Sequence, residues 1–432
     1  MRMKRPYNKK AAQKTEPKEE KKSVAKKSTV LTKQDDFSAD LISQLNKEAG
    51  SQIAWNLQAD SAPTNIKRWI STGSRQLDSI LSNRVIGGFP EGRIVEVSGE
   101  SSSGKTHLVL HAAKSTQKMG GIVVYIDTEN ATNLDNLIRL GINVNERFVF
   151  VQTACTEEVF QVAENAILKA RAMKKDVPVT IIWDSVAATS PKAELEGDYD
   201  QNTIGLQARV IGKGLRKITN IIGNQNVLFL LVNQLRKNIG VMFGDPNTTP
   251  GGMSLPYSCS IRIRITSSGQ AQIKDKNDNP IGIKVKAKTI KNKVSKPFRD
   301  CEFKIIFGEG IDETEEVFDL FRTHCETTKN GLVMPNGDVV MVSGGGAWKN
   351  FLVTSKDGEV LHDIKFYKPE FKAKVLDLPE FHDYIEALYE ASLVIKSGVT
   401  EHPTLAGVDE DSFEEIRGLA IDSQGGKKEL EL

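Results

Sequence analysis

The stretch Gly99-Glu100-Ser101-Ser102-Ser103-Gly104-Lys105-Thr106 most strongly constrains what this chain can fold into. It fits the pattern Gly-x4-Gly-Lys-Ser/Thr, and it lies between an apolar run at 93–97 and a helical pattern at 105–119. In this setting the glycines let the backbone wrap a phosphate group, and amide N–H groups at the helix start point at its oxygens. Lys105 would neutralise the β- and γ-phosphates, and Thr106 would ligate Mg²⁺. The sequence therefore predicts a site for a nucleoside triphosphate.

Composition limits the classes of protein that this chain can be. Its 432 residues leave room for two or three domains. No apolar run approaches the ~18 residues of a membrane helix, and no hydrophobic segment follows the charged N-terminus, so neither a membrane span nor a secretory signal is expected. The four cysteines form no Cys-x-x-Cys pair, and His107 and His111 lack a third metal ligand. These features favour a cytoplasmic protein with reduced, mostly buried thiols.

The two ends of the chain differ from its middle. Residues 1–36 are rich in lysine, glutamate, serine and threonine, and they hold too few large apolar residues to fold, so a disordered basic tail is expected. This tail either attaches to nucleic acid or is a solvated leader. Residues 405–432 are predicted to be a second flexible tail. Within the segment 37–70, a short amphipathic helix is expected from a cap at Ser38 to about Gly50, and it must pack on its own core or on a neighbouring subunit.

Apolar runs alternate with helical stretches between residues 71 and 312. The runs are 93–97, 121–126, 148–152, 179–183 and 227–232, and the helical stretches are 105–119, 157–174 and 203–222. Strands separated by helices predict an α/β core with a mostly parallel sheet that is covered by helices. Three shorter runs, 261–265, 281–288 and 302–307, are expected to extend the sheet antiparallel. Residues 313–404 predict a small α+β domain with a helix at 381–395.

Polar residues follow several of the apolar runs. In sheets of this class, ligands bind outside the carboxyl ends of the strands. Asp184 directly follows an apolar run and is therefore the candidate for supporting Mg²⁺. Glu129 would act as the general base that orients a water for attack on the γ-phosphate. Gln234 would sense the γ-phosphate through a hydrogen bond.

Two further segments are rich in glycine or in basic residues, and each pattern fits either nucleic-acid or phosphate binding or a plain surface. The segment after Gln234 is rich in glycine and threonine and carries Arg236, Met242 and Phe243, which suits stacking and phosphate contact with single-stranded nucleic acid. Composition alone slightly favours a plain surface loop. The basic run 284–296 is either a solvated face or a contact to phosphates, of DNA or of a nucleotide on the next subunit.

Other motifs accompany the phosphate-binding loop along the chain. They are Ile70-Ser71-Thr72-Gly73-Ser74 with Leu77-Asp78, Gly92-Arg93-Ile94-Val95-Glu96-Val97, Trp183-Asp184-Ser185-Val186-Ala187-Ala188, Pro191-Lys192-Ala193-Glu194, Asn233-Gln234-Leu235-Arg236, Ile239-Gly240-Val241-Met242-Phe243-Gly244 and Lys291-Asn292-Lys293. Taken together and in this order, they resemble the RecA family of recombinases. The resemblance runs from about Ser38 to Lys396.

The resemblance implies a RecA-type ATPase core that binds ATP and Mg²⁺ and hydrolyses ATP in response to DNA. Carried over by position, the nucleotide contacts are Gly99, Glu100, Ser101, Ser102, Ser103, Gly104, Lys105, Thr106, His107 and Asp184, with Thr106 and Asp184 at the metal. Glu129 would activate water, and Gln234 would couple the γ-phosphate to a DNA loop. Lys291 and Lys293 would reach the ATP of the adjacent subunit, in the manner of arginine fingers.

The resemblance also implies a helical filament on single-stranded DNA that pairs with homologous double-stranded DNA and exchanges strands. The helix at 39–49 would dock on a neighbouring subunit, and the domain after residue 313 would capture duplex DNA. Single-strand-binding protein and loading mediators are further expected partners. Two loops would bind DNA, the first around residues 194–203 and the second around residues 238–252. The implied DNA-contacting residues are Glu194, Gly197, Ile204, Arg209, Arg216, Arg236, Met242, Phe243, Gly251 and Gly252.

The chain departs from the family pattern at several positions. The proline of the usual phosphate-binding loop is missing, so that Glu100 directly follows Gly99, and Asn136 stands where bacterial members carry a tyrosine that stacks on adenine. Pro256 interrupts a helix that follows the second DNA loop. These departures fit a divergent member, such as one encoded by a virus. A ring-shaped motor of the same fold and a non-hydrolysing DNA-binding scaffold are the competing interpretations.

Overall fold

The computed structural model describes residues 37–57, 64–173, 176–198, 200, 203, 205–237, 246–267 and 272–395. The chain divides into two compact units, Met1–Asn65 and Ile66–Leu432. Both predicted tails, at 1–36 and 405–432, lie outside the described residues.

The first unit contains one helix, α1 (Phe37–Ala49), within its described residues. The helix ends where the sequence predicts, but Ser38 lies inside it, so the expectation that Ser38 caps the helix is wrong. The side chain of Asn46 bonds to the backbone of Ile53 and Ala54, which holds the following segment against the helix. None of the residues of α1 is buried, and its apolar side chains are accessible.

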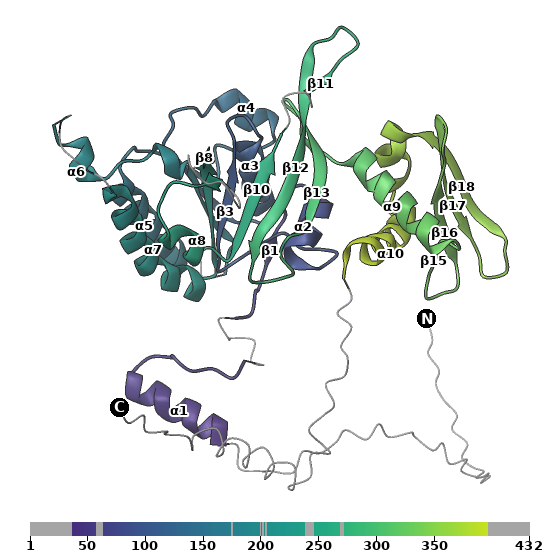
Figure 1. The fold of residues 1–432 in the computed structure, drawn as a ribbon. Helices are drawn as coiled ribbons and strands as arrows, with labels where there is room; N and C mark the ends of the chain where they lie inside the picture. The colour runs from purple at the N-terminus through teal and green to yellow at the C-terminus, as the bar shows by residue number, and fades with distance from the viewer. Residues whose placement is uncertain are drawn as a thin grey trace, which may run out of the picture. The chain divides into compact units, whose positions relative to one another are not determined.

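The second unit is built on a large twisted sheet, seen in Figure 1 with its central strands side by side. Its strand order is β14-β13-β12-β10-β3-β7-β6-β4-β5, and β11 pairs with β12. The bounds are β3 (Ile94–Gly99), β4 (Ile122–Asp127), β5 (Phe148–Gln152), β6 (Val179–Asp184), β7 (Val227–Gln234), β10 (Ile261–Thr266), β11 (Gln272–Lys274), β12 (Pro280–Asn292), β13 (Asp300–Ile306) and β14 (Gly310–Asp312).

The pairing of β10 corrects one expectation from the sequence. The run at 261–265 was expected to be antiparallel, but β10 pairs in parallel with β3. The antiparallel part of the sheet begins only at β12, which pairs with β10 on one side and β13 on the other. The direction of a strand depends on the route of the preceding connection, which alternation of apolar residues does not reveal.

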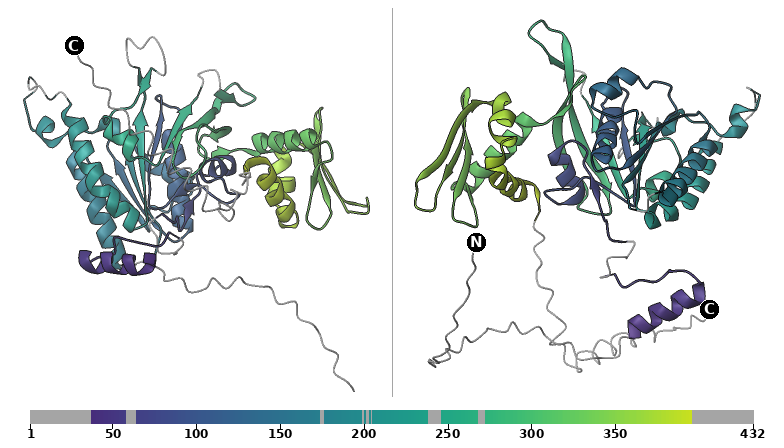
Figure 2. Two further views of the ribbon diagram at one scale, coloured as in Figure 1. Left: turned by 60° about the horizontal axis from the view of Figure 1, so that its bottom comes forward. Right: turned by 180° about the vertical axis from the view of Figure 1, so that it is seen from behind.

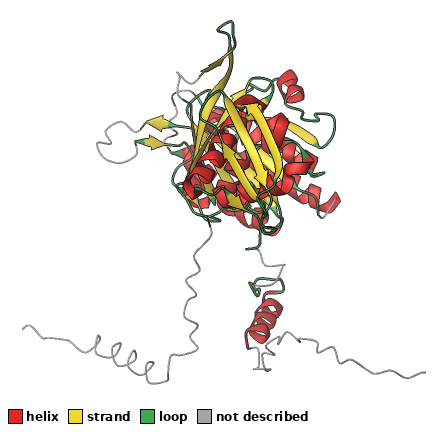
Figure 3. Cartoon of the chain, turned by 90° about the vertical axis from the view of Figure 1, so that its right-hand side faces the viewer, coloured by secondary structure: helices red, strands yellow, loops and turns green. Residues whose placement is uncertain are grey.

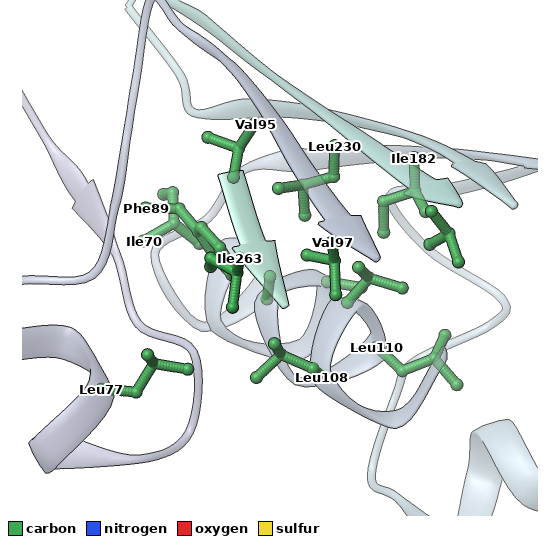
Figure 4. Packing of buried hydrophobic residues seen from close by; sticks show 14 of the residues in the cluster. Ile70, Leu77, Phe89, Val95, Val97, Leu108, Leu110, Ile182, Leu230 and Ile263 are labelled. Carbon is green, nitrogen blue, oxygen red and sulfur yellow. The ribbon is translucent and has the colours of Figure 1, made fainter. Parts of the chain in front are cut away.

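Helices pack on both faces of this sheet; Figure 3 colours the helices red and the strands yellow. One face packs on α2 (Arg75–Ser82), α3 (Lys105–Lys118) and α4 (Leu134–Arg139). Figure 4 shows this layer, in which Val97 and Leu230 of the strands face Leu108 and Leu110 of α3. The opposite face packs on α5 (Thr156–Met173) and α7 (Leu206–Asn224). The predicted α/β core with a mostly parallel sheet is confirmed.

The described residues after 313 form a small α+β region within the second unit. Helix α9 (Thr314–Thr328) leads into an antiparallel sheet of β15 (Leu332–Val333), β16 (Val339–Ser343), β17 (Trp348–Thr354) and β18 (Val360–Tyr367), and α10 (His382–Leu393) follows short 3₁₀- and π-helical turns. The predicted helix at 381–395 therefore exists with slightly shorter bounds. Figure 2 shows α9 and α10 on one face of this sheet. Its core is a cluster of phenylalanines, Phe318, Phe321, Phe351, Phe366, Phe371 and Phe381.

Short elements complete the described chain. They are β1 (Trp69–Ile70), β2 (Phe89–Pro90), α6 (Lys192–Leu195), β8 (Arg236–Lys237), β9 (Asn247–Thr248) and α8 (Ser254–Ser258). The four cysteines are buried and free, as predicted. A membrane-crossing helix, which would need to be longer and more apolar than any seen here, is absent from the described part of the chain.

Candidate nucleotide and DNA sites

The phosphate-binding loop connects β3 to the start of α3. Two of its residues, Ser102 and Gly104, adopt positive φ angles of 58° and 96°. The φ of Gly104 lies in a region that residues with a Cβ atom rarely adopt, so this turn favours glycine. The Lys105 ammonium donates to the carbonyl oxygen of Glu100 at 2.7 Å, which folds the lysine back over the loop.

A cavity of about 610 Å³ lies against this loop. Residues 100–107 line it together with Ser267, Gln272, Ile283 and Phe307. The hydroxyl oxygen of Ser103 is buried, and among the described residues it has no hydrogen-bond partner. Three features of the loop fit a bound triphosphate: the positive φ of Gly104, the buried Ser103 hydroxyl and the position of Lys105 at the start of α3.

Asp184, at the end of β6, meets Thr106 beside the loop. The Thr106 hydroxyl donates to Asp184 Oδ2 at 2.9 Å, and the Tyr125 hydroxyl donates to the same oxygen at 2.8 Å. Burial raises the pKa of Asp184, although these two hydrogen bonds oppose the shift. Burial also lowers the pKa of Lys105, against the opposing charges of Asp184 and Glu129. A carboxylate and a threonine hydroxyl are oxygen ligands of the kind that Mg²⁺ prefers, so the pair fits this ion.

Glu129 and Gln234 meet at the same edge of the sheet, although 105 residues separate them. Gln234 Nε2 donates to Glu129 Oε1 at 3.1 Å, and the Ser185 hydroxyl donates to the same oxygen. Asp127 has a different task, because its carboxylate accepts the backbone N–H groups of Glu129, Asn130 and Thr132 and so fixes the loop that carries Glu129. Glu129 follows β4, Asp184 ends β6 and Gln234 ends β7. The carboxyl ends of these three strands therefore bring the three predicted side chains to one edge of the sheet.

Sequence reasoning missed two residues of this site. Tyr125 is the buried donor to Asp184, but in the sequence it is one of several apolar residues of a strand. Phe307 follows β13 and lines the cavity, about half exposed. Asn136 lies on α4 and is not among the residues that line the cavity, whereas Phe307 lines it together with the ring of His107. Only the sheet order brings Phe307 close to a loop 200 residues earlier, so no local signal could have shown it.

The second predicted DNA loop begins and ends on a two-stranded ribbon. Strand β8, which carries exposed Arg236, pairs antiparallel with β9. Met242 and Phe243 lie outside the described residues, as does Ile204 of the first loop. Gly251 and Gly252 have φ angles of 105° and 75°, and a Cβ atom at Gly252 would lie 2.6 Å from the Cβ atom of Ala208 on α7. The glycines therefore let the end of the loop lie directly against the first turn of α7.

The start of α7 also presents positive charge. Arg209 and Arg216 are exposed and seven residues apart, which places them on one face of the helix, and Lys213 lies exposed between them. Glu194, in α6, is exposed, and Gly197 follows that helix. The structure thus brings the two predicted DNA loops to the same end of α7. Lys213 is a further member of the basic face that sequence reasoning missed.

Lys291 and Lys293 lie where β12 ends. The Lys291 ammonium donates to the carbonyl oxygens of Pro256 and Tyr257, at 2.5 and 3.2 Å, and Lys293 is exposed. Burial and the neighbouring Lys293 lower the pKa of Lys291. Helix α8 is only Ser254–Ser258 and contains Pro256, so the predicted interruption coincides with a helix of little more than one turn. The roles of both lysines remain predictions.

Comparison with known proteins agrees with the motifs and the fold. The family described as the RecA N-terminal domain matches residues 38–312. Protein RecA of Leptospira meyeri is 39% identical over 73% of this chain and 78% of its own length. Protein RecA of Geobacter sulfurreducens is 41% identical over 65% of this chain and 78% of its own length, and that of Wolbachia pipientis subsp. Culex pipiens is 36% identical over 81% and 92%. The chain belongs to the RecA family of recombination and repair proteins, which are DNA-dependent ATPases of the P-loop type.

Proposed function

We propose that this protein is an ATP-dependent recombinase that forms helical filaments on single-stranded DNA and exchanges strands with a homologous duplex. The observation that supports this most directly is the position of Gln234. Its side chain contacts Glu129 at the nucleotide site, while the next residues form the ribbon at the base of the second DNA loop. One residue thus belongs to both sites, as a protein that links ATP to DNA requires.

At the nucleotide site, each residue has a distinct task. Lys105 and the backbone of residues 100–105 bind the phosphates, and Thr106 and Asp184 hold Mg²⁺, which offsets the negative charge of the phosphates. Glu129 orients the attacking water and accepts its proton. Phe307 and Ile283 provide the apolar surface for the adenine base, in place of the tyrosine that Asn136 replaces.

Filament formation uses surfaces that the single chain leaves uncovered. Helix α1 has an apolar face with Leu41 and Leu45 exposed to 42% and 39%. Strand β5 forms one edge of the large sheet and exposes Val149 and Phe150, and unpaired strand edges invite contact with another chain. In the filament, α1 docks on a neighbouring subunit, and Lys291 and Lys293 reach the neighbour's ATP.

Electron microscopy with single-stranded DNA, Mg²⁺ and a non-hydrolysable ATP analogue tests the proposal. Long helical filaments that need both DNA and the nucleotide are the expected result. Closed rings would favour the ring-shaped motor of the same fold instead. ATP hydrolysis is measured in parallel with and without DNA, because a non-hydrolysing scaffold would show no turnover in either condition.

A further inference from the structure

A buried polar cluster lies on the face of the sheet that α7 and α8 cover. Its centre is Glu96 of β3, whose carboxylate is fully buried. Arg262 Nε of β10 donates to this carboxylate at 2.5 Å, and Asn233 Nδ2 of β7 donates to it at 2.9 Å. The apolar residues around the cluster form the hydrophobic layer under α5 and α7. A buried charge in such a layer is costly unless it is paired and hydrogen-bonded, so this arrangement fixes three strands relative to one another.

The cluster also holds the end of the second DNA loop. Asn233 Nδ2 donates to the carbonyl oxygen of Pro250 at 2.9 Å as well as to Glu96. Arg262 Nη2 donates to the hydroxyl oxygen of Thr249 at 3.2 Å. Thr249 and Pro250 directly precede the glycine pair that lies against α7. The end of the loop is therefore held by side chains that themselves bind a buried carboxylate.

Asn233 connects this cluster to the nucleotide site. Its Oδ1 atom accepts the backbone N–H of Gln234 at 3.0 Å. Successive residues of a strand point to opposite faces, so Asn233 faces the cluster while Gln234 faces the nucleotide side. Gln234 in turn contacts Glu129. A shift of the Gln234 backbone toward or away from the nucleotide side would therefore move Asn233 or break this bond.

We propose that Glu96, Arg262 and Asn233 are positioning residues that transmit the state of Gln234 to the loop end at Thr249 and Pro250. The inference rests on the proposed function, because it assigns the route by which bound ATP changes the affinity for DNA. None of the three touches the nucleotide, and each acts through Gln234 or through the loop. When the cluster is lost, the protein still binds ATP and DNA, but bound ATP no longer changes the affinity for DNA.

The test compares the affinity of the full chain for fluorescent oligothymidylate in Mg²⁺ with a non-hydrolysable ATP analogue and in Mg²⁺ with ADP. The ratio of the two affinities measures the coupling. The variant is E96Q/R262M, because removing both charges avoids leaving one buried charge unpaired. Its control is K374M/E370Q, which removes a surface pair of the C-terminal domain whose side chains are 44% and 42% exposed. Thermal unfolding and binding of a fluorescent ATP analogue are measured on both variants.

We expect the ratio to fall by about tenfold in E96Q/R262M and to stay at the wild-type value in the control. A milder variant, Thr249→Val, keeps the charges and removes only the hydroxyl that Arg262 contacts, so it tests the route even if the double variant does not fold. Its ratio should fall by roughly threefold. A wild-type ratio in both folded variants overturns the inference alone. A wild-type protein whose DNA affinity is the same with either nucleotide overturns the proposed function and the inference with it.

Discussion

The ATPase core and the C-terminal domain both pack helices on a sheet, but the strands of the two sheets run in different relative directions. In the core the central strands are parallel, and their carboxyl ends collect Asp184, Glu129 and Gln234 at one edge. In the C-terminal domain the sheet is antiparallel, and one of its faces packs on helices through the phenylalanine cluster. Parallel strands gather their carboxyl ends on one side, whereas antiparallel strands alternate them, so only the core has an edge where functional groups converge.

The two regions are joined by hydrogen bonds to the carboxylate of Glu313 and by an ion pair. Glu313 precedes α9, and its carboxylate accepts the Ser74 hydroxyl and the backbone N–H of Arg75 at the start of α2. Arg75 also pairs with Glu386 of α10 and lies over the ring of Tyr389. Polar contacts therefore link the two regions, whose interiors are apolar. We expect that each region can be perturbed separately.

The largest expected effect follows from Lys105→Ala. Removing the ammonium that binds the phosphates should lower ATP turnover by about a thousandfold, or ~4 kcal/mol of transition-state stabilisation. The measurement is ATP hydrolysis with saturating single-stranded DNA. Lys118→Ala changes an exposed lysine of the same helix and should have little effect. Turnover at the wild-type rate in Lys105→Ala would remove the loop from the mechanism.

Phe321→Ala should separate the stability of the two regions. The side chain is fully buried and packs edge-to-face on Phe371 and Tyr389, so its loss should destabilise the C-terminal domain by about 3–4 kcal/mol. Hydrogen exchange followed by mass spectrometry should show faster exchange in β16–β18 with little change in β3–β7. Equally faster exchange in both sheets would show that the regions unfold as one unit.

Asp78, in α2 of the core, should make stability depend on pH. This carboxyl is buried and binds Ser71 and Thr72, and burial raises its pKa to about 7. Because the pKa is higher in the folded state than in the unfolded state, the contribution to stability is complete below about pH 4 and is lost as the pH rises through about 7. Between about pH 6 and pH 8 the loss should be ~1.4 kcal/mol. Urea unfolding of the wild type and of Asp78→Asn checks this, and an equal pH dependence in both proteins would contradict it.

The smallest effect is expected for Phe307→Ala, the counterpart of Phe321→Ala in the core. Phe307 is about half exposed, so its truncation should cost little stability. Loss of the apolar surface for the base should weaken ATP binding by roughly fivefold, about 1 kcal/mol. Equilibrium binding of a fluorescent ATP analogue provides the measurement, and Phe307→Tyr should restore the affinity. Unchanged affinity in Phe307→Ala would place the base elsewhere.

Much of the core could be predicted from the sequence because its signals are local. Each strand of the parallel sheet appears as a short apolar run, and a polar residue that follows such a run lies at the carboxyl edge wherever the strand is placed. Asp184 and Gln234 were found in this way. For the C-terminal domain, only its α+β class and one helix could be predicted, because its phenylalanines meet across a sheet whose pairing no local pattern specifies.

The sequence by itself determined the phosphate-binding loop, the alternation of strands and helices and the family. Only the tertiary structure decided that β10 runs parallel to β3, that Tyr125 bonds to Asp184 and that Phe307 lines the cavity. It also decided that Glu96, read as one polar residue in an apolar strand, is buried against Arg262 and Asn233. The physical reason is common to all of these features. A motif is specified by residues that are neighbours in the chain. Each of these contacts instead depends on strand order, and strand order is set by how the strands and helices of the whole core pack together.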